Sequence, residues 1–302
     1  MARNHRFTRL WQSPYVRHVR RVVSPGYAFR CLTARHRRMP DFIIAGAQKS
    51  GTTSLYAYLI EHPQVQLPVR KELRFFDNNF QAGENWYRMH FPFKPMGKEA
   101  TKTLCGESTA YYMCYPHAAK RIAETIPSVK IILLLRNPVD RAFSHYQLNL
   151  RRGIEPLSFD DAIAAESMRL EQDRDRMLED SSYCSFAHEK FSYLARGRYA
   201  EQLVRWRSFF GNEQLLVIES SEFFKDTEAV YSEVLKFLGL PEAAPAHFGN
   251  RFPGKYKIRM SDVTRERLED YFLPHNEQLY TMLGRRFRWD CEPQVRSGVV
   301  AA

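Results

Sequence analysis

The chain has few of the features that mark secreted, metal-binding or membrane-spanning proteins. Its five cysteines are scattered and form no C-x-x-C pair, so neither a disulfide framework nor a metal site is expected. No Asn-x-Ser/Thr sequence for N-glycosylation occurs in the 302 residues. The longest apolar run, Ile131–Leu135, is far shorter than the roughly 18 residues of a membrane span, and there is no signal-peptide core. A reducing compartment fits best, and we expect a cytoplasmic protein.

Acidic residues and lysine are absent from residues 1–40, which contain ten arginines. Subtracting these ten from the 45 basic residues leaves 35 against 34 acidic ones, so the body is nearly neutral despite a net charge of +11. A nucleic-acid-binding surface on the body is therefore not indicated. We expect residues 1–40 to be a basic N-terminal extension and residues 41–302 to be one domain.

The purpose of the extension is left open by its sequence. A weak amphipathic stripe at helical spacing lies among its arginines, formed by Trp11, Tyr15, Val19 and Val22. The segment can be a solvated basic lead-in. It can also contact a membrane surface peripherally or bind a polyanionic partner, and its composition is similar to that of a transit peptide.

The most informative stretch is Asp41–Tyr56, in which an apolar strand leads through a Gly/Ser loop into a hydroxyl-rich helix start. Successive backbone N–H groups and the positive end of a helix dipole would then point at one spot, as in phosphate sites. Lys49 stands two residues before Gly51, whereas the Walker A lysine follows the last glycine. The loop is a candidate phosphate site distinct from that of ATPases, the alternative being an ordinary turn with an exposed lysine.

A second constellation, Arg136–Ser144, follows another buried strand. Asn137-Pro138 predicts a capped helix start, and Ser144 lies seven residues past that cap, on the same face. Ligands of open α/β sheets bind at the carboxyl ends of strands, where an arginine fork and a hydroxyl suit a phosphate dianion. The alternative is a structural ion pair and an ordinary helix serine.

From Asp41 onward, strand-like and helix-like segments alternate. Buried strands are predicted at Asp41–Gly46, Val129–Arg136 and Leu215–Glu219. Helices are predicted at Thr52–Glu61, Asn85–His90, Pro116–Thr125, Pro138–Leu150, Phe159–Leu178, Tyr199–Phe209, Glu222–Leu238 and Val263–Leu283, the last interrupted by Pro274. The alternation predicts an α/β, three-layer fold with a central, mainly parallel sheet flanked by helices.

The two constellations together resemble the 5′- and 3′-phosphate sites of sulfotransferases that use 3′-phosphoadenosine 5′-phosphosulfate (PAPS). The resemblance is closest to heparan sulfate N- and 3-O-sulfotransferases and their bacterial relatives, and it covers roughly residues 40–290. Five further stretches match in order: Lys71–Asp77, Trp86–Pro92, Gly106–Tyr112, Tyr199–Trp206 and Tyr271–Tyr280. The resemblance implies a P-loop-like fold and sulfuryl transfer to a hydroxyl or amine, with a carbohydrate or glycoconjugate as the acceptor.

The resemblance also implies roles for particular residues. Lys49, Ser50, Gly51, Thr52 and Thr53 would bind the 5′-phosphosulfate, with Lys49 as the catalytic cation. Arg136 and Ser144 would bind the 3′-phosphate, and Lys255 in a late basic loop would be a further nucleotide ligand. Glu72 occupies the place of the catalytic base, the product would be adenosine 3′,5′-bisphosphate, and no metal would be required.

Other bases and other functions remain open. Small-molecule sulfotransferases use a histidine, and the sequence offers His62, His90, His117 and His145. Glu107 is a second acidic candidate that could instead orient the loop or Lys49. The basic neighbours of Glu72, namely Arg70, Lys71 and Arg74, would suit an anionic acceptor.

Two alternatives to a sulfotransferase are a non-catalytic binder of nucleotide or anionic glycan and a P-loop kinase. A kinase needs a carboxylate for Mg²⁺ at the end of a buried strand. The strand Val129–Leu135 ends in Arg136 instead, which disfavours the kinase.

Overall fold

The apolar run at Phe42–Gly46 forms β1, the middle strand of a five-stranded sheet in the order β2-β3-β1-β4-β5. The computed structural model describes residues 25–290 except 67, 96–102, 246 and 249–257. The other strands are β2 (Val65–Gln66), β3 (Leu104–Ser108), β4 (Lys130–Leu135) and β5 (Leu215–Glu219). All four neighbouring pairs are parallel.

Side chains of β1 and β4 enter two separate apolar cores, one on each face of the sheet. Ile44 and Ile132 pack with α4 (Thr52–Leu59), α12 (Ser220–Lys225) and α13 (Thr227–Leu238). Ile43 and Ile131 pack with α5 (Glu84–Arg88), α6 (Ala118–Thr125) and α11 (Tyr199–Arg207). Burial on both faces explains why these strands are apolar throughout. The predicted three-layer α/β fold is confirmed.

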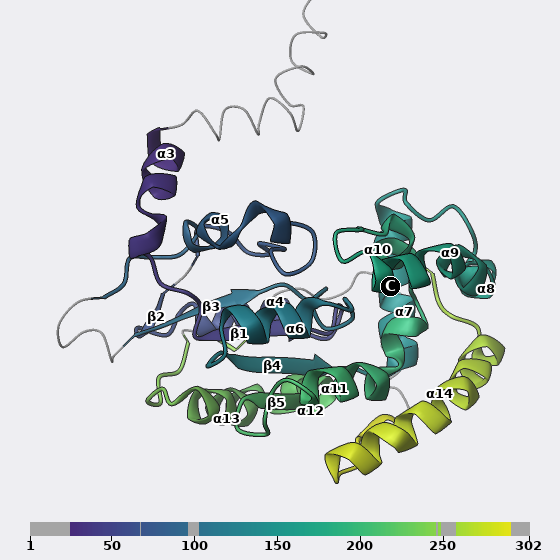
Figure 1. Ribbon diagram of the computed structural model, residues 1–302. Helices are drawn as coiled ribbons and strands as arrows, with labels where there is room; N and C mark the ends of the chain where they lie inside the picture. Colours follow the sequence, from purple (N-terminus) through teal and green to yellow (C-terminus); the bar gives the residue numbers. More distant parts are fainter. Residues whose placement is uncertain (1–24, 67, 96–102, 246, 249–257, 291–302) are drawn as a thin grey trace, which may run out of the picture.

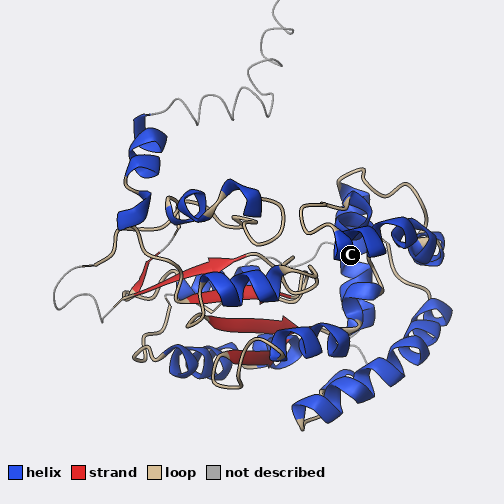
Figure 2. Ribbon diagram, in the orientation of Figure 1, coloured by secondary structure: helices blue, strands red, loops and turns tan. Residues whose placement is uncertain are grey.

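A third group of helices gathers beyond the carboxyl ends of the strands (Figures 1 and 2). It comprises α7 (Pro138–Arg151), α8 (Phe159–Ala164), α9 (Glu166–Glu179), α10 (Phe186–Phe191) and α14 (Asp262–Leu283). A smaller apolar cluster joins α7 and α8 to Leu268 and Phe272 of α14. These helices frame the edge of the sheet at which the two predicted phosphate sites lie.

The structure corrects several element predictions. The sequence predicts three strands, but β2 and β3 also exist. β3 contains Gly106 and Glu107, residue types that are uncommon in buried strands. The helix predicted at Phe159–Leu178 is divided between α8 and α9. The one predicted at Glu222–Leu238 divides at Asp226, whose side chain accepts from the Ala229 N–H and caps α13.

The expected interruption at Pro274 is absent, because α14 runs unbroken from Asp262 to Leu283. Proline removes one N–H donor from a helix and clashes with the preceding turn. Phe272 and Leu279, on either side of it, are fully buried. Their packing holds the helix in place across the proline.

Part of the predicted extension packs on the body. Helix α3 (Pro25–Leu32) is followed by a turn in which Ala34 is buried. Arg37 donates to the Phe91 carbonyl over 2.8 Å, and Arg38 pairs with Asp41 over 2.6 Å. The boundary at residue 40 stays a prediction, and the stripe from Trp11 to Val22 lies outside the described residues.

Candidate active site

A cavity of about 860 Å³ opens at the carboxyl ends of β1, β4 and β5. Seven of the predicted site residues line it: Lys49, Gly51, Thr52, Thr53, Glu72, Arg136 and Ser144. The two predicted phosphate sites therefore face one cavity, although Arg136 comes 83 positions after Thr53 in the sequence. Lys255 lies outside the described residues.

The loop after β1 turns sharply into helix α4. Lys49 and Gly51 have φ angles of 73° and 95°, both in the left-handed region. Gly51 stands at the N-cap of α4, where a Cβ would lie 3.0 Å from the Phe224 ring. Glycine is thus required both by the turn and by the close approach of α12. The first N–H groups of α4 have no partner within the helix and are available at its positive end.

Ser50 is the one residue of the predicted 5′ loop that does not line the cavity. It is fully buried, and its N–H donates to the Ala47 carbonyl over 3.3 Å. The Ser50 carbonyl accepts from the Ser220 hydroxyl over 3.0 Å. Ser50 therefore ties the loop to the start of α12.

The second constellation has the local structure that its sequence predicts. The Asn137 side chain accepts from the Val139 N–H over 2.9 Å, and Pro138 occupies the first turn of α7. Tyr199 donates to the Arg136 carbonyl over 2.8 Å, which fixes the backbone at the end of β4. The Arg136 guanidinium donates to the Lys49 carbonyl over 3.2 Å. The two loops are thus joined by a direct hydrogen bond.

Glu72 enters the cavity from the loop between β2 and β3. Its φ of 56° is in the left-handed region, as is that of Arg74 at 55°, which is uncommon for residues other than glycine. The Glu72 N–H donates to the Ser108 carbonyl over 3.2 Å. The backbone is thereby held where it presents Glu72 to the cavity.

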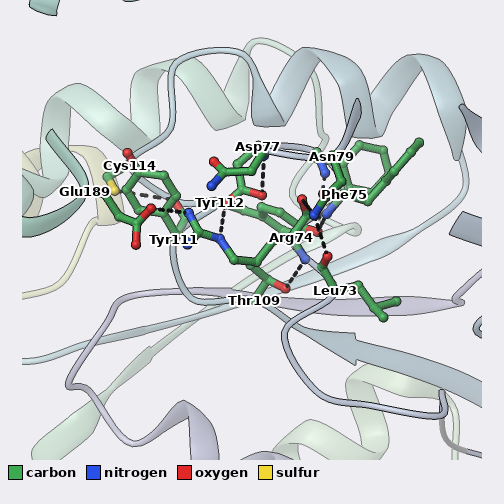
Figure 3. Close-up of polar contacts among 12 residues, drawn as sticks. Leu73, Arg74, Phe75, Asp77, Asn79, Thr109, Tyr111, Tyr112, Cys114 and Glu189 are labelled. Atoms are coloured by element: carbon green, nitrogen blue, oxygen red, sulfur yellow. Dashed lines mark hydrogen bonds and ion pairs between the residues drawn. The ribbon is translucent and has the colours of Figure 1, made fainter. Parts of the chain in front are cut away.

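The basic neighbours of Glu72 are engaged within the protein. Lys71 donates to the Thr53 hydroxyl over 2.5 Å, and burial lowers the pKa of Lys71. Arg74 pairs with Asp77 and with Glu189, each over 2.8 Å (Figure 3). The Arg70 guanidinium lies 5.8 Å from the Trp86 ring centre. The sequence misses Lys71 as a contact of the 5′ loop.

The alternative bases are poorly placed. None of the four candidate histidines lines the large cavity, and three of them bond to main-chain carbonyls: His62, His90 and His117. His145 lines a smaller adjoining cavity of about 180 Å³. Burial holds the pKa of His145 well below its usual range, which makes it a weak base.

Glu107 is fully buried and does not line either cavity. Three hydroxyl groups donate to its carboxylate, from Tyr87, Thr109 and Tyr112. Burial raises the pKa of Glu107 to about 7, and the hydrogen bonds oppose that rise. A carboxyl group outside both cavities is not in a position to accept a proton from an acceptor bound in either of them.

Several cavity residues are not singled out by the sequence: Ser220, Ser221, Phe224, Arg265, Glu269, Arg288 and Trp289. Those at 220–224 follow β5, so the predicted carboxyl end of that strand is a signal that could have located them. Arg265 pairs with Asp140 of α7 over 2.9 Å. Nothing local marks residues 265–289, because tertiary packing brings them to the site. Among the described residues, no group of three or more metal-ligating side chains occurs.

Comparisons with known proteins agree on one family. The sulfotransferase domain family matches residues 39–248. The chain is 28% identical over 316 residues to "Membrane-associated sulfotransferase kil1" of Dictyostelium discoideum, covering 83% of the chain and 66% of that protein. It is 31% identical to human "Bifunctional heparan sulfate N-deacetylase/N-sulfotransferase 3", covering 91% of the chain but 32% of that protein.

One solved structure is similar to this chain both in sequence and in fold. The sulfotransferase of Alicyclobacillus acidocaldarius is 30% identical with a TM-score of 0.65, over 83% of this chain and 99% of that one. The chain spans between about a quarter and two thirds of the first curated relatives that it matches.

Proposed function

Because the chain belongs to the sulfotransferase domain family, we propose that it transfers a sulfuryl group from PAPS to an acceptor hydroxyl or amine. The observation that carries the proposal is the shared cavity, in which the Lys49 loop faces Arg136 and Ser144. PAPS is anionic at both ends, and both of these groups suit an anion. A volume of about 860 Å³ is at the upper end of the usual ligand-site range of about 300–1,000 Å³.

The residues present fit the nucleotide. Thr52 and Thr53 line the cavity at the N-terminus of α4, where hydroxyls and N–H groups would bind the 5′-phosphate. Lys49 would stabilise charge that develops on the leaving oxygen. Arg136 and Ser144 would bind the 3′-phosphate at the start of α7. PAPS supplies the sulfuryl group, and Glu72 would remove the proton of the acceptor.

The acceptor that we propose is a carbohydrate or glycoconjugate, because relatives at about 30% identity are named for heparan sulfate. Sulfation of oxygen and of nitrogen both fit a carboxylate base. A panel of N-desulfated heparan sulfate, a glycolipid and p-nitrophenol, assayed with radiolabelled PAPS, would identify the class. Transfer to none of these acceptors would favour a non-catalytic binder.

We expect the wild-type protein to bind adenosine 3′,5′-bisphosphate more tightly than 5′-AMP or ATP in calorimetric titration. Arg136→Ala should weaken bisphosphate binding by about 10- to 100-fold, because a charge-assisted bond to the 3′-phosphate is lost. Ser144→Ala should weaken it by about tenfold. Ser144→Ala should alter 5′-AMP binding less than about threefold, because 5′-AMP has no 3′-phosphate. Arg136→Ala should weaken 5′-AMP binding less than it weakens bisphosphate binding, the remaining loss coming from the bond to the Lys49 carbonyl.

Arg267→Ala is the matched control, since Arg267 is an exposed arginine on α14 that pairs with Asp160. It should leave all three affinities unchanged. Equal binding of the three nucleotides by the wild type would contradict the 3′-phosphate assignment. A preference for ATP with Mg²⁺ would instead support the kinase alternative.

We further propose a cytoplasmic location with peripheral binding to an anionic membrane surface. The four described cysteines are free thiols, which suits a reducing compartment. Within the described residues no helix could cross a bilayer. Phe29 and Leu32 of α3 are 55% and 82% exposed, and α3 projects from one edge of the body in Figure 1. Apolar side chains beside an arginine-rich, acid-free segment match an anionic bilayer.

Vesicle sedimentation tests this membrane contact. We expect binding to phosphatidylcholine vesicles that contain phosphatidylserine and little binding to phosphatidylcholine alone. Leu32→Ser should weaken binding by about tenfold through loss of an inserted side chain. Leu178→Ser is the control, because Leu178 is 55% exposed on α9. Equal binding to both kinds of vesicle would contradict the proposal.

A further inference from the structure

Glu107 of β3 forms the centre of a buried polar network, and Glu107 itself lines neither of the two cavities. Its carboxylate accepts from the Thr109 hydroxyl over 2.7 Å and from the Tyr112 hydroxyl over 2.8 Å. Tyr87 of α5 donates to the other carboxylate oxygen. All four residues are almost fully buried. A buried carboxyl group needs hydrogen-bond partners, and this network supplies three of them.

The hydroxyls of Tyr112 and Thr109 also contact the loop that carries Glu72. Tyr112 Oη accepts from the Phe75 N–H over 2.8 Å and from the Phe76 N–H over 3.4 Å. Thr109 Oγ1 accepts from the Arg74 N–H over 3.4 Å. Figure 3 shows Thr109 and Tyr112 lying against the backbone of residues 73–75.

The direction of each hydroxyl hydrogen is set by the carboxylate. A hydroxyl has a single hydrogen and two acceptor positions. Because Tyr112 and Thr109 donate their hydrogens to Glu107, their lone pairs remain free to accept the loop N–H groups. The accepting oxygen of Glu107 thus orients the two hydroxyls, and the hydroxyls hold the backbone.

The loop needs this support because its backbone is strained at Glu72 and Arg74, both at positive φ. Such conformations persist only where the surroundings over-determine them. Other contacts contribute: the Asn79 side chain donates to the Leu73 and Arg74 carbonyls. The network at Glu107 binds the three consecutive N–H groups that begin two residues after Glu72.

We propose that Glu107 is a positioning residue that holds Glu72 in the cavity by orienting the hydroxyls of Tyr112 and Thr109 toward the loop. That Glu72 is a base to be positioned rests on the proposed sulfotransferase function. The hydrogen bonds from Glu107 through the two hydroxyls to the loop do not depend on that function. A leucine at position 107 would be of similar size but would have no acceptor for the hydroxyl hydrogens. The Tyr112 and Thr109 hydroxyls would lose the partner that fixes their hydrogens, so they would turn and the loop N–H bonds would weaken.

Two readouts on the full chain separate the two parts of the proposal. The first is amide hydrogen exchange at residues 74–76 with adenosine 3′,5′-bisphosphate present, which requires no turnover. The second is kcat, together with KM for PAPS, using the acceptor of the panel that is sulfated fastest. The variants are Glu107→Leu and Tyr112→Phe. The control is Tyr115→Phe, because Tyr115 is a buried tyrosine that donates to the Ser181 carbonyl instead.

We expect exchange at Phe75 and Phe76 to quicken about tenfold or more in both variants and to stay unchanged in the control. kcat should fall by about 10- to 100-fold in the variants, because a displaced base loses alignment. KM for PAPS should change less than about threefold, since the nucleotide contacts are elsewhere.

Unchanged exchange at these amides in both variants would overturn the proposal, as would faster exchange with unchanged kcat. A rise in KM with kcat preserved would also overturn it, because it would move the effect to the nucleotide. If Glu107→Leu does not fold, Tyr112→Phe alone decides. If the wild type sulfates nothing, the proposed function fails while the exchange result still tests the network.

Discussion

Replacing Lys49 with alanine is expected to lower the rate of sulfuryl transfer by about a thousandfold. Losses of this size follow the removal of a group that stabilises an oxyanion or a transferring phosphoryl group. Lys49 lines the cavity at the turn between β1 and α4. Its ammonium would meet charge that grows on the leaving oxygen as the sulfuryl group departs. Because that interaction is strongest in the transition state, the loss should appear mainly in kcat.

Measurement of kcat and KM with radiolabelled PAPS tests this expectation, with bisphosphate affinity measured alongside. Lys49→Arg should recover part of the rate, because the charge is retained with a different shape. Lys236→Ala is the control, since Lys236 is an exposed lysine on α13. A loss of only a few fold in Lys49→Ala would remove Lys49 from the catalytic role.

The second large effect is expected for Glu72→Gln, which should lower kcat by about 10²- to 10⁴-fold, the range of general-base catalysis. Glutamine keeps the shape of the side chain but has no useful basicity. Affinity for adenosine 3′,5′-bisphosphate should stay within about threefold, because an isosteric change leaves the nucleotide contacts in place. The loss should be smaller with p-nitrophenol than with a sugar hydroxyl, because an acidic phenol needs less help to lose its proton.

Glu269 provides the sharpest comparison, since it is another carboxylate lining the same cavity and lies 3.6 Å from the Arg265 guanidinium. If Glu269→Gln reduced kcat as much as Glu72→Gln, the assignment of Glu72 as the catalytic base would fail. Glu179→Gln, at the exposed end of α9, should leave the rate unchanged. An equal loss with phenol and sugar acceptors would contradict proton removal as the role of Glu72.

The sequence predicts the parts of the fold in which neighbouring residues carry the information. β1 and β4 are apolar on both faces, and the sequence Asn137-Pro138 by itself predicts the start of α7. The residues that follow these strands could be assigned to one edge of a parallel sheet. Their meeting at one cavity follows from the parallel pairing of β1 with β4.

β3 could not be predicted in this way, because Gly106 and Glu107 are unusual in a buried strand. Gly106 is required since a Cβ there would overlap the Phe42 ring of β1 at 2.0 Å. Glu107 is tolerated because Tyr87, from a separate helix, donates to it. Both reasons lie in residues distant in sequence, as do those that bring Arg288 and Trp289 to the cavity. Long-range contacts of this kind leave no periodic signal.

The hydrogen bond from Arg136 to the Lys49 carbonyl links the two proposed phosphate sites directly. The 5′ loop is not a transferable module, because the Arg136 side chain braces its backbone at Lys49. Grafting one of the two segments alone onto another parallel sheet would transfer its amino-acid sequence without its geometry. A substitution at Arg136 would remove this brace, whereas a substitution at Lys49 would keep the main-chain carbonyl that accepts it.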